Sequence, residues 1–490
     1  MQPTTDCFVR KKAHAHIENQ IQKQTRAFAH DPRKALGMEI EDPPEHDPRE
    51  ALGMEIEDPP EHDPREALGM EIEDPPEHDP RGHARRGLGM EIEETAEHCP
   101  WAHTTDCIRA DPARARKLAS SLHLTRRWAL ASETEKNVAR ILEHDMHAAR
   151  NEWLLTPPKA IQGVLRALLW DERDMPIAFV FVNVLLLTLP AAVAVFSAQS
   201  HALGCLYLLA NTALMQERFT LALHYSAHRR LTRSRVLNAL PSYVLGPLFG
   251  IPPGMYHLHH IVMHHNEQNV FPWDISSTEK YQRDSILHFV LYWLRFLLAA
   301  WVELPAYAFL RGRGLLGAQC LCTITASTLL YKHAWRCYPV GTLWVLLLPA
   351  LLGSLLLMFG NWCQHIFIDG SGDTTPYSYT YNAVCTPHNQ TSFNDGYHVE
   401  HHLNSRLHWS EFPVQLAKRL HLYKRHDALI FQGLGFMRIG LLAMRGDYDT
   451  LARHVVPLHH PPHPLSHYSA MLRSRVRPVT HPRPAFTRSL

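Results

Sequence analysis

Three short clusters of histidine contain the side chains best suited to chemistry in this chain. They are His224 and His228; His260, His264 and His265; and His398, His401 and His402. A spacing of three or four residues places imidazoles on one helix face, about one turn apart. A lone histidine of this kind is usually a surface or core residue, but three clusters together favour a metal site.

The number of histidines indicates which metal they would bind. Eight imidazoles are too many for one zinc ion, which takes four ligands, and the chain has no HExxH motif. Neutral imidazole suits iron, and eight or nine nitrogen ligands suit two iron ions. The clusters therefore predict a di-iron site.

Apolar runs after Met175 predict the helices that position these clusters. We expect membrane spans at 176–197, 202–215, 315–330 and 340–358. A further run, 286–304, contains His288, Arg295 and Glu303, which are costly at mid-bilayer, so we expect it to lie at the interface. The predicted fold is an all-α membrane protein: four transmembrane helices, an interfacial helix, and a cytosolic helical cap that carries the histidines.

The orientation follows from charge. Clusters that share a metal site must lie on one side of the membrane, so an even number of crossings separates them. Arg229, Arg230, Arg233 and Arg235 follow the second span, whereas the loop 199–201 has neither lysine nor arginine. The positive-inside rule therefore predicts that the histidines face the cytosol, although Lys332 and Arg336 on the other side weaken the asymmetry.

The first 150 residues have the composition of an extension. Four near-copies of HDPRxALGMEIEDPPE, 16 residues apart, begin at His30, His46, His62 and His78 and fill 30–97. Each copy has too little apolar surface to offset its ordering entropy, so we expect disorder or single helical turns rather than a folded array. We assign 151–445 to the membrane domain and 446–490 to a Pro/His/Arg-rich tail.

Composition excludes other classes. Lys+Arg 49 against Asp+Glu 48 gives a net charge of +1, which argues against nucleic acid as a partner. The 9 cysteines form no CxxC pair, so neither a disulfide framework nor a thiolate zinc site is expected. A reducing compartment fits this usage.

The spacing HxxxH, HxxxHH and HxxHH over about residues 170–445 resembles the membrane fatty acid desaturases. That family also has a histidine after the fourth span, preceded four residues earlier by an asparagine that reaches iron through water; His365 and Asn361 match these positions. The resemblance implies that two ferrous ions are held by His224, His228, His260, His264, His265, His365, His398, His401 and His402, with Asn361 outside the direct shell.

The resemblance also implies the reaction. Two irons would use O2 to remove hydrogen from an unactivated methylene, which places a double bond in a long acyl chain of a lipid in the endoplasmic reticulum membrane. No HPGG haem motif is present, so the electrons would come from a separate donor, cytochrome b5 or ferredoxin with its reductase. A hydroxylase with the same centre is the alternative, and a non-catalytic membrane metal-binding protein is a third reading.

Metal-bound imidazoles usually donate their second N–H to a carboxylate or carbonyl. The candidates near the clusters are Glu267, Asp369, Asp395 and Glu400. His257 and His259 match no ligand of the family, and we expect them to face solvent or the membrane surface.

Overall fold

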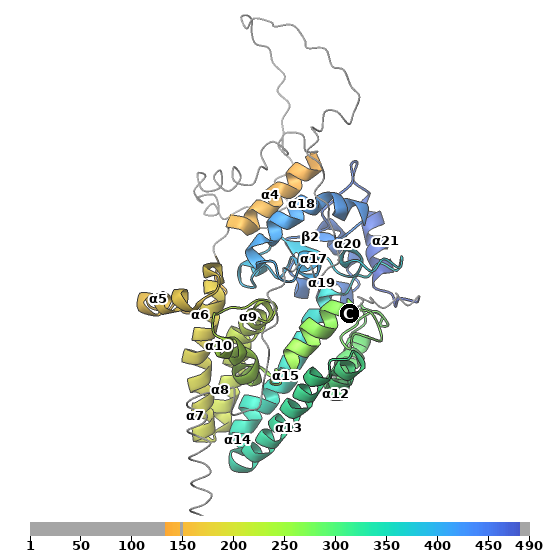
Figure 1. Cartoon of the computed structure of the whole chain (residues 1–490). Coiled ribbons are helices and arrows are strands. Elements are labelled where there is room, and N and C mark those ends of the chain that lie inside the picture. The colour runs from red at the N-terminus through yellow and green to blue at the C-terminus, as the bar shows by residue number, and fades with distance from the viewer. Residues whose placement is uncertain (1–132, 148–149, 481–490) are drawn as a thin grey trace, which may run out of the picture. The chain divides into compact units, whose positions relative to one another are not determined.

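The computed structural model describes residues 133–147 and 150–480. The repeats at 30–97 and the last ten residues lie outside the described residues. The described chain is mostly helical, with one short pair of parallel strands that aligns Asn382 with Ile430. Figure 1 shows long helices at one end and a group of shorter elements, including α17, α18, α20 and α21, at the other.

The first elements of the described chain lead up to and include the second histidine cluster. They are α4 (Glu133–His147), α5 (Lys159–Leu168), η3 (Glu172–Asp174), α6 (Met175–Asn183), η4 (Val184–Thr188), α7 (Leu189–Ala198), α8 (His201–Asn211), η5 (Thr212–Gln216), α9 (Glu217–His228), α10 (Arg235–Leu240), η6 (Pro241–Leu245), η7 (Gly246–Phe249), η8 (His257–His264) and α11 (His265–Glu267).

The remaining elements run from the third apolar segment to the last described helix. They are α12 (Ile286–Leu310), α13 (Gly314–Cys337), α14 (Pro339–Thr342), η9 (Leu343–Leu347), α15 (Leu348–Gln364), α16 (Pro376–Tyr379), β1 (Asn382–Val384), η10 (Pro387–Gln390), α17 (His398–Leu403), η11 (Trp409–Glu411), α18 (Phe412–Arg425), β2 (Ile430–Gln432), α19 (Phe436–Met444), α20 (Tyr448–Arg453) and α21 (Leu465–Arg475).

Within residues 133–147 and 150–480, four helices are long and apolar enough to cross a membrane: Glu172–Ala198, Ile286–Leu310, Gly314–Cys337 and Pro339–Gln364. The number four agrees with the sequence prediction, and three of these helices contain the expected spans. The fourth is Ile286–Leu310, which we expected at the interface. The expected span 202–215 is not among them, because its helix continues through η5 into α9 and becomes polar at Gln216 and Glu217.

Close contacts hold the first hairpin to its neighbours. Thr188 Oγ1 donates to Asn211 Oδ1 at 3.0 Å, and Asn211 Nδ2 donates to Leu248 O at 3.2 Å. Gly204 of α8 faces Trp344, where an added Cβ would lie 2.3 Å from the indole ring. Because these polar groups are buried in apolar surroundings, their mutual hydrogen bonds fix the pairing of α7 with α8.

The segment after 445, which we separated as a tail, forms α20 and α21 in the described residues. Tyr448, Leu451 and Leu472 are buried in one apolar cluster with Trp362 of α15. The buried Arg283 guanidinium donates to the backbone oxygens of Ile366 and Arg475, both at 2.9 Å. These contacts join α21 to the chain that follows α15.

Helix α4, within the stretch assigned to the extension, contacts the chain that leads into α17. The buried Asp145 carboxylate accepts hydrogen bonds from Cys385 N at 2.8 Å, Asn389 Nδ2 at 2.9 Å and Tyr397 OH at 2.8 Å. Tyr397 directly precedes His398. The end of the extension therefore fixes the backbone from which the third histidine cluster begins.

The Asp145→Ala variant should lose stability, because three buried donors lose their acceptor. We expect a cost of about 3 kcal/mol, since an unsatisfied buried polar group costs roughly 1–3 kcal/mol and the donors can reorganise in part. The measurement is the Tm of the purified protein in detergent, with the exposed Glu143→Ala on the same helix as control. Equal Tm values for the two variants would contradict the role of Asp145.

Removing residues 1–97 should leave specific activity intact, because that segment contains none of the histidines of the three clusters. Extending the deletion through residue 147 removes α4, and the protein should then behave like Asp145→Ala or worse. The readouts are Tm and activity at equal protein level. A loss of activity in the shorter deletion would show that the repeats belong to the catalytic unit.

Candidate metal centre

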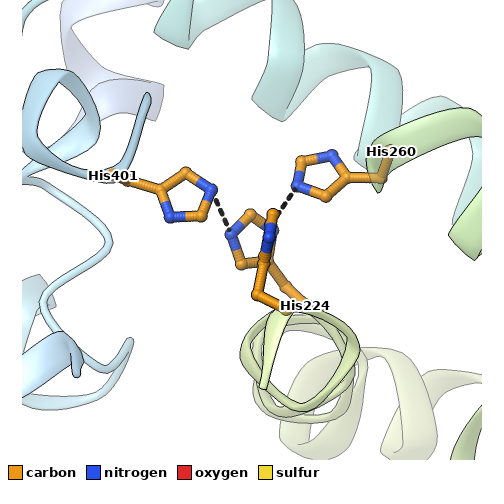
Figure 2. A group of neighbouring side chains, drawn as sticks. His224, His260 and His401 are labelled. Carbon is orange, nitrogen blue, oxygen red and sulfur yellow. Dashed lines mark hydrogen bonds between the residues drawn. The ribbon is translucent and has the colours of Figure 1, made fainter. Parts of the chain in front are cut away.

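Nine predicted ligand histidines gather at the junction between the long helices and the cap. His224 and His228 project from α9, and the second cluster lies on η8 and α11. His365 follows the last residue of α15, and the third cluster lies on α17. Figure 2 shows the rings of His224, His260 and His401 converging from three separate elements.

Eight of these side chains form two groups that could each hold a metal ion. The first is His224, His228, His260 and His401, and the second is His264, His365, His398 and His402; within each group the ligand atoms lie within 4.8 Å of one another. His265 adjoins the first group, because its Nε2 lies 3.2 Å from His260 Nε2 and 3.0 Å from His401 Nε2.

The ring nitrogens of the first group cannot satisfy one another. His224 Nε2 lies 2.9 Å from His401 Nε2, and His260 Nε2 lies 3.1 Å from His228 Nε2. With the two contacts of His265, five Nε2 atoms form a continuous chain of close approaches. Each Nε2 of a neutral imidazole has either one N–H or one lone pair, so a nitrogen with two close neighbours can form a full hydrogen bond with only one of them. A bound cation resolves this arrangement, and the donor set fits one.

Burial keeps these histidines uncharged. Desolvation lowers the pKa of His224 to about 3, and it also lowers the pKa values of His265 and His401 well below the usual range. Neighbouring imidazoles add to the effect, because protonating one places a charge beside the others. Metal ions bind the neutral form of imidazole, so the histidines are held in their ligating state.

The second group has a similar geometry. His402 Nε2 lies 3.2 Å from His398 Nε2. The His365 ring centroid lies 5.1 Å from that of His264 and 5.2 Å from those of His398 and His402. The ring contact between His265 and His402, at 4.6 Å, joins the two groups.

The far nitrogens of several rings contact fixed oxygens. His264 Nδ1 lies 2.7 Å from the buried carboxylate of Asp274, and His224 Nδ1 lies 3.2 Å from Tyr256 OH. His365 Nδ1 lies 3.1 Å from Tyr379 O, and His402 Nδ1 lies 3.4 Å from Tyr379 OH. Contacts of this kind fix the orientation of a ring and direct its other nitrogen at the metal.

The carboxylates that we expected in this supporting role have other partners in the described chain. Glu267 pairs with Arg311, Asp369 with Arg475, and Glu400 with Arg419. Asp395 accepts a hydrogen bond from Gln364 at 2.8 Å. Sequence reasoning missed Asp274 because it follows His264 by ten residues, which is beyond helical spacing. The available signal was the Asp-x-Ser sequence, in which Ser276 donates to Asp274 at 2.6 Å.

Asn361 lies one helical turn before His365. Its Nδ2 donates to Ser276 O at 3.0 Å and to Tyr292 OH at 2.7 Å. This amide thereby connects α15 and α12 to the loop that contains Asp274. Asn361 also lines a cavity of about 320 Å³ together with His264 and His398. A lipid chain in this cavity would lie directly beside both histidine groups.

The two histidines outside the ligand set differ from each other. His257 is exposed, as expected. His259 is buried, with 7% of its surface exposed, and it lines the cavity beside the histidine groups. Our prediction that His259 faces solvent or the membrane surface was wrong, because the π-helical turn of η8 shifts the faces on which its residues lie.

A third group, Asp171, Asp174 and His408, also has the spacing of metal ligands. Arg229 Nη2 lies 3.2 Å from Asp171 and 3.8 Å from Asp174, and His408 Nε2 lies 3.0 Å from Asp174. The arginine supplies the positive charge that a cation would otherwise bring. This group therefore acts as an ion-pair network that joins the end of α9 to the chain before η11.

Comparison with known proteins identifies the class. Residues 200–433 match the fatty acid desaturase family, and this stretch contains all nine histidines and Asn361. Over this stretch the chain is similar to the fatty acid desaturases, a family of oxidoreductases. No curated protein and no solved structure gives a significant match to the chain.

The Asp274→Asn variant should bind metal more weakly, because His264 loses the anion that orients its ring. Loss of such a partner typically lowers metal affinity by about 10–100-fold. The measurement is metal retained during titration with a chelator. Asp427→Asn is the matched control, since Asp427 also pairs with a histidine, His459, at 2.8 Å but on the surface. Equal retention by both variants would show that Asp274 has no such role.

Proposed function

We propose that this protein is a membrane desaturase that introduces a double bond into a long acyl chain, using O2 and two iron ions. The convergence of nine histidines into two adjacent groups is the observation that supports it most directly. In this proposal His224, His228, His260, His265 and His401 hold one iron. His264, His365, His398 and His402 hold the other, with Asn361 nearby through water.

When bound, the two irons would supply the O2-dependent removal of hydrogen from a methylene group. The protein's own contribution is position and exclusion of water. The cavity beside His264 and His398 places one segment of an extended chain against the centre, and Leu356 and Leu357 of α15 supply apolar wall. Asp274 and Tyr256 keep the rings of His264 and His224 in their ligating orientation.

We propose that the histidines face the cytosol and that α12 lies along the membrane interface. Near its start, Tyr292 OH accepts from Asn361 at 2.7 Å; near its end, Tyr307 OH donates to Val262 O at 3.3 Å. Both partners lie within four residues of a ligand histidine. A helix that contacts the centre near both ends follows one membrane face, which supports four crossings built from Glu172–Ala198, α8 with η5, α13 and Pro339–Gln364.

The electrons for this reaction are proposed to come from a separate protein, cytochrome b5 or ferredoxin with its reductase. We propose the endoplasmic reticulum as the membrane, with the domain at 151–445 as the catalytic unit. The basic residues after α9, Arg230, Arg233 and Arg235, would then lie on the cytosolic surface, where an acidic donor protein could approach.

Expression in yeast microsomes with NADH should yield acyl lipids two mass units lighter, detected by mass spectrometry. The His264→Ala and His401→Ala variants should insert into membranes but produce none of this species, because each loses one ligand and no membrane-spanning surface. If the dominant product is instead a lipid with one added oxygen atom, the reaction is hydroxylation and not desaturation. No change in any lipid class, despite full metal content, would favour the non-catalytic reading.

The Asn361→Ala variant should lose less activity than His365→Ala, because its proposed contact with iron runs through water. The iron content of Asn361→Ala should stay close to that of the parent protein, whereas His365→Ala should lose iron from one site. Iron is measured by elemental analysis and activity by product formation. Equal losses in the two variants would place Asn361 in direct contact with the metal.

A further inference from the structure

Two neighbouring cavities lie close to the histidine groups. The first, of about 320 Å³, extends from His260 and His264 along η5 and α9 on one side and α15 on the other. The second, of about 90 Å³, lies among Met255, Phe296, Ala300 and Leu304. Tyr256, His259 and Leu357 line both cavities. His259 can therefore contact an occupant of either cavity.

His259 belongs to neither histidine group and has no role in the proposed metal centre. Its ring packs against Phe296, with 4.9 Å between ring centroids, and its Nε2 has no hydrogen-bond partner in the described part of the chain. A neutral imidazole offers one nitrogen as donor and the other as acceptor. A buried polar group without a partner is costly, and such groups persist where a ligand supplies the missing bond.

The larger cavity is mainly apolar, but part of its wall consists of polar side chains. Thr212, Gln216, Glu217 and Thr220 line it from one helix, and Gln364, His388 and Asp395 line it from the cap side. Some of these groups are already paired: Glu217 with His388 at 2.6 Å, and Asp395 with Gln364 at 2.8 Å. The threonine hydroxyls have no hydrogen-bond partner that the described structure shows. A purely hydrocarbon occupant would bury these groups unpaired.

We propose that His259 binds a hydroxyl group carried on the lipid chain, so that the site selects hydroxylated chains over plain ones. This inference rests on the proposed function, because it specifies the substrate of the same site. A hydroxyl both donates and accepts, as a neutral imidazole does, so one contact satisfies both groups. The smaller cavity then holds the alkyl segment beyond the hydroxyl, among Phe296, Ala300 and Leu304.

The position of His259 sets where the hydroxyl lies relative to the reacting carbon. His259 directly precedes His260, and its ring centroid lies 6.4 Å from that of His264. The hydroxyl would therefore sit a few carbon atoms from the methylene that faces the histidine groups. A site built around such a hydrogen bond rejects the analogue that lacks it more strongly than an apolar pocket rejects an extra hydroxyl.

The test is a competition assay on the full-length protein in detergent, without reductant so that no turnover occurs. Radiolabelled stearate is displaced by unlabelled stearate or by hydroxystearates whose hydroxyl is moved carbon by carbon along the chain. We expect one position to compete at least about 10-fold better than stearate. His259→Leu should remove this preference, His259→Gln should keep part of it, and the exposed His257→Leu should behave as the parent protein.

Metal content is measured for every variant and should not change, since His259 is outside both ligand groups. Equal competition by stearate and all hydroxystearates in the parent protein would overturn the proposal. Water would then be the hydrogen-bond partner of the polar side chains in the cavity. A preference that survives in His259→Leu would overturn the role of His259. If the microsomal assay yields no desaturated lipid but the preference for one hydroxystearate is present, the proposed desaturation is wrong and the hydroxyl-binding site is supported.

Discussion

The structure depends on holding many neutral imidazoles together where they cannot satisfy one another. The Nε2 atoms of His224, His401 and His265 approach within about 3 Å of their neighbours, and none of the rings can take up a second proton without charging a buried cluster. Such an arrangement is costly without a cation and stable with one. Much of the fold beside the centre serves to prevent these rings from turning away.

The restraints come from segments far apart in the chain, and each acts on the backbone or ring of a ligand histidine. Asp274 contacts the ring of His264, and Asn361 connects that loop to α15 and α12. Asp145 of α4 accepts from Tyr397, the residue before His398. Buried carboxylates and amides with several hydrogen-bond partners are suited to this task. If one of them moved, all of its partners would be left unsatisfied. The centre is thus restrained from the membrane side and from the cap side together.

The sequence predicted the parts of the site that follow from local spacing. Histidines three or four residues apart share a helix face wherever the helix lies, so the three clusters could be recognised without a fold. Their division into two groups could not be predicted, because His260 and His264 lie one turn apart yet join different groups. Asp274 and Asp145 were missed because their contacts arise from tertiary folding. His259 was misplaced because a residue that matches no ligand of the family can still be buried, as His259 is on the π-helical turns of η8.

Helix α12 qualifies as a membrane span by length and composition alone. Its composition is apolar enough to cross a bilayer, yet Arg295 pairs with Glu303 at 2.8 Å and also donates to Ile275 O at 2.9 Å. These partly exposed charges are paired with each other, so the helix need not place an unpaired charge in lipid. The loop from Asp274 to Ser276 receives hydrogen bonds from Tyr292, Arg295 and Asn361. Helix α12 therefore supports the second histidine cluster. This role explains why it contains Tyr292 and Arg295, polar residues that a simple membrane anchor would not need.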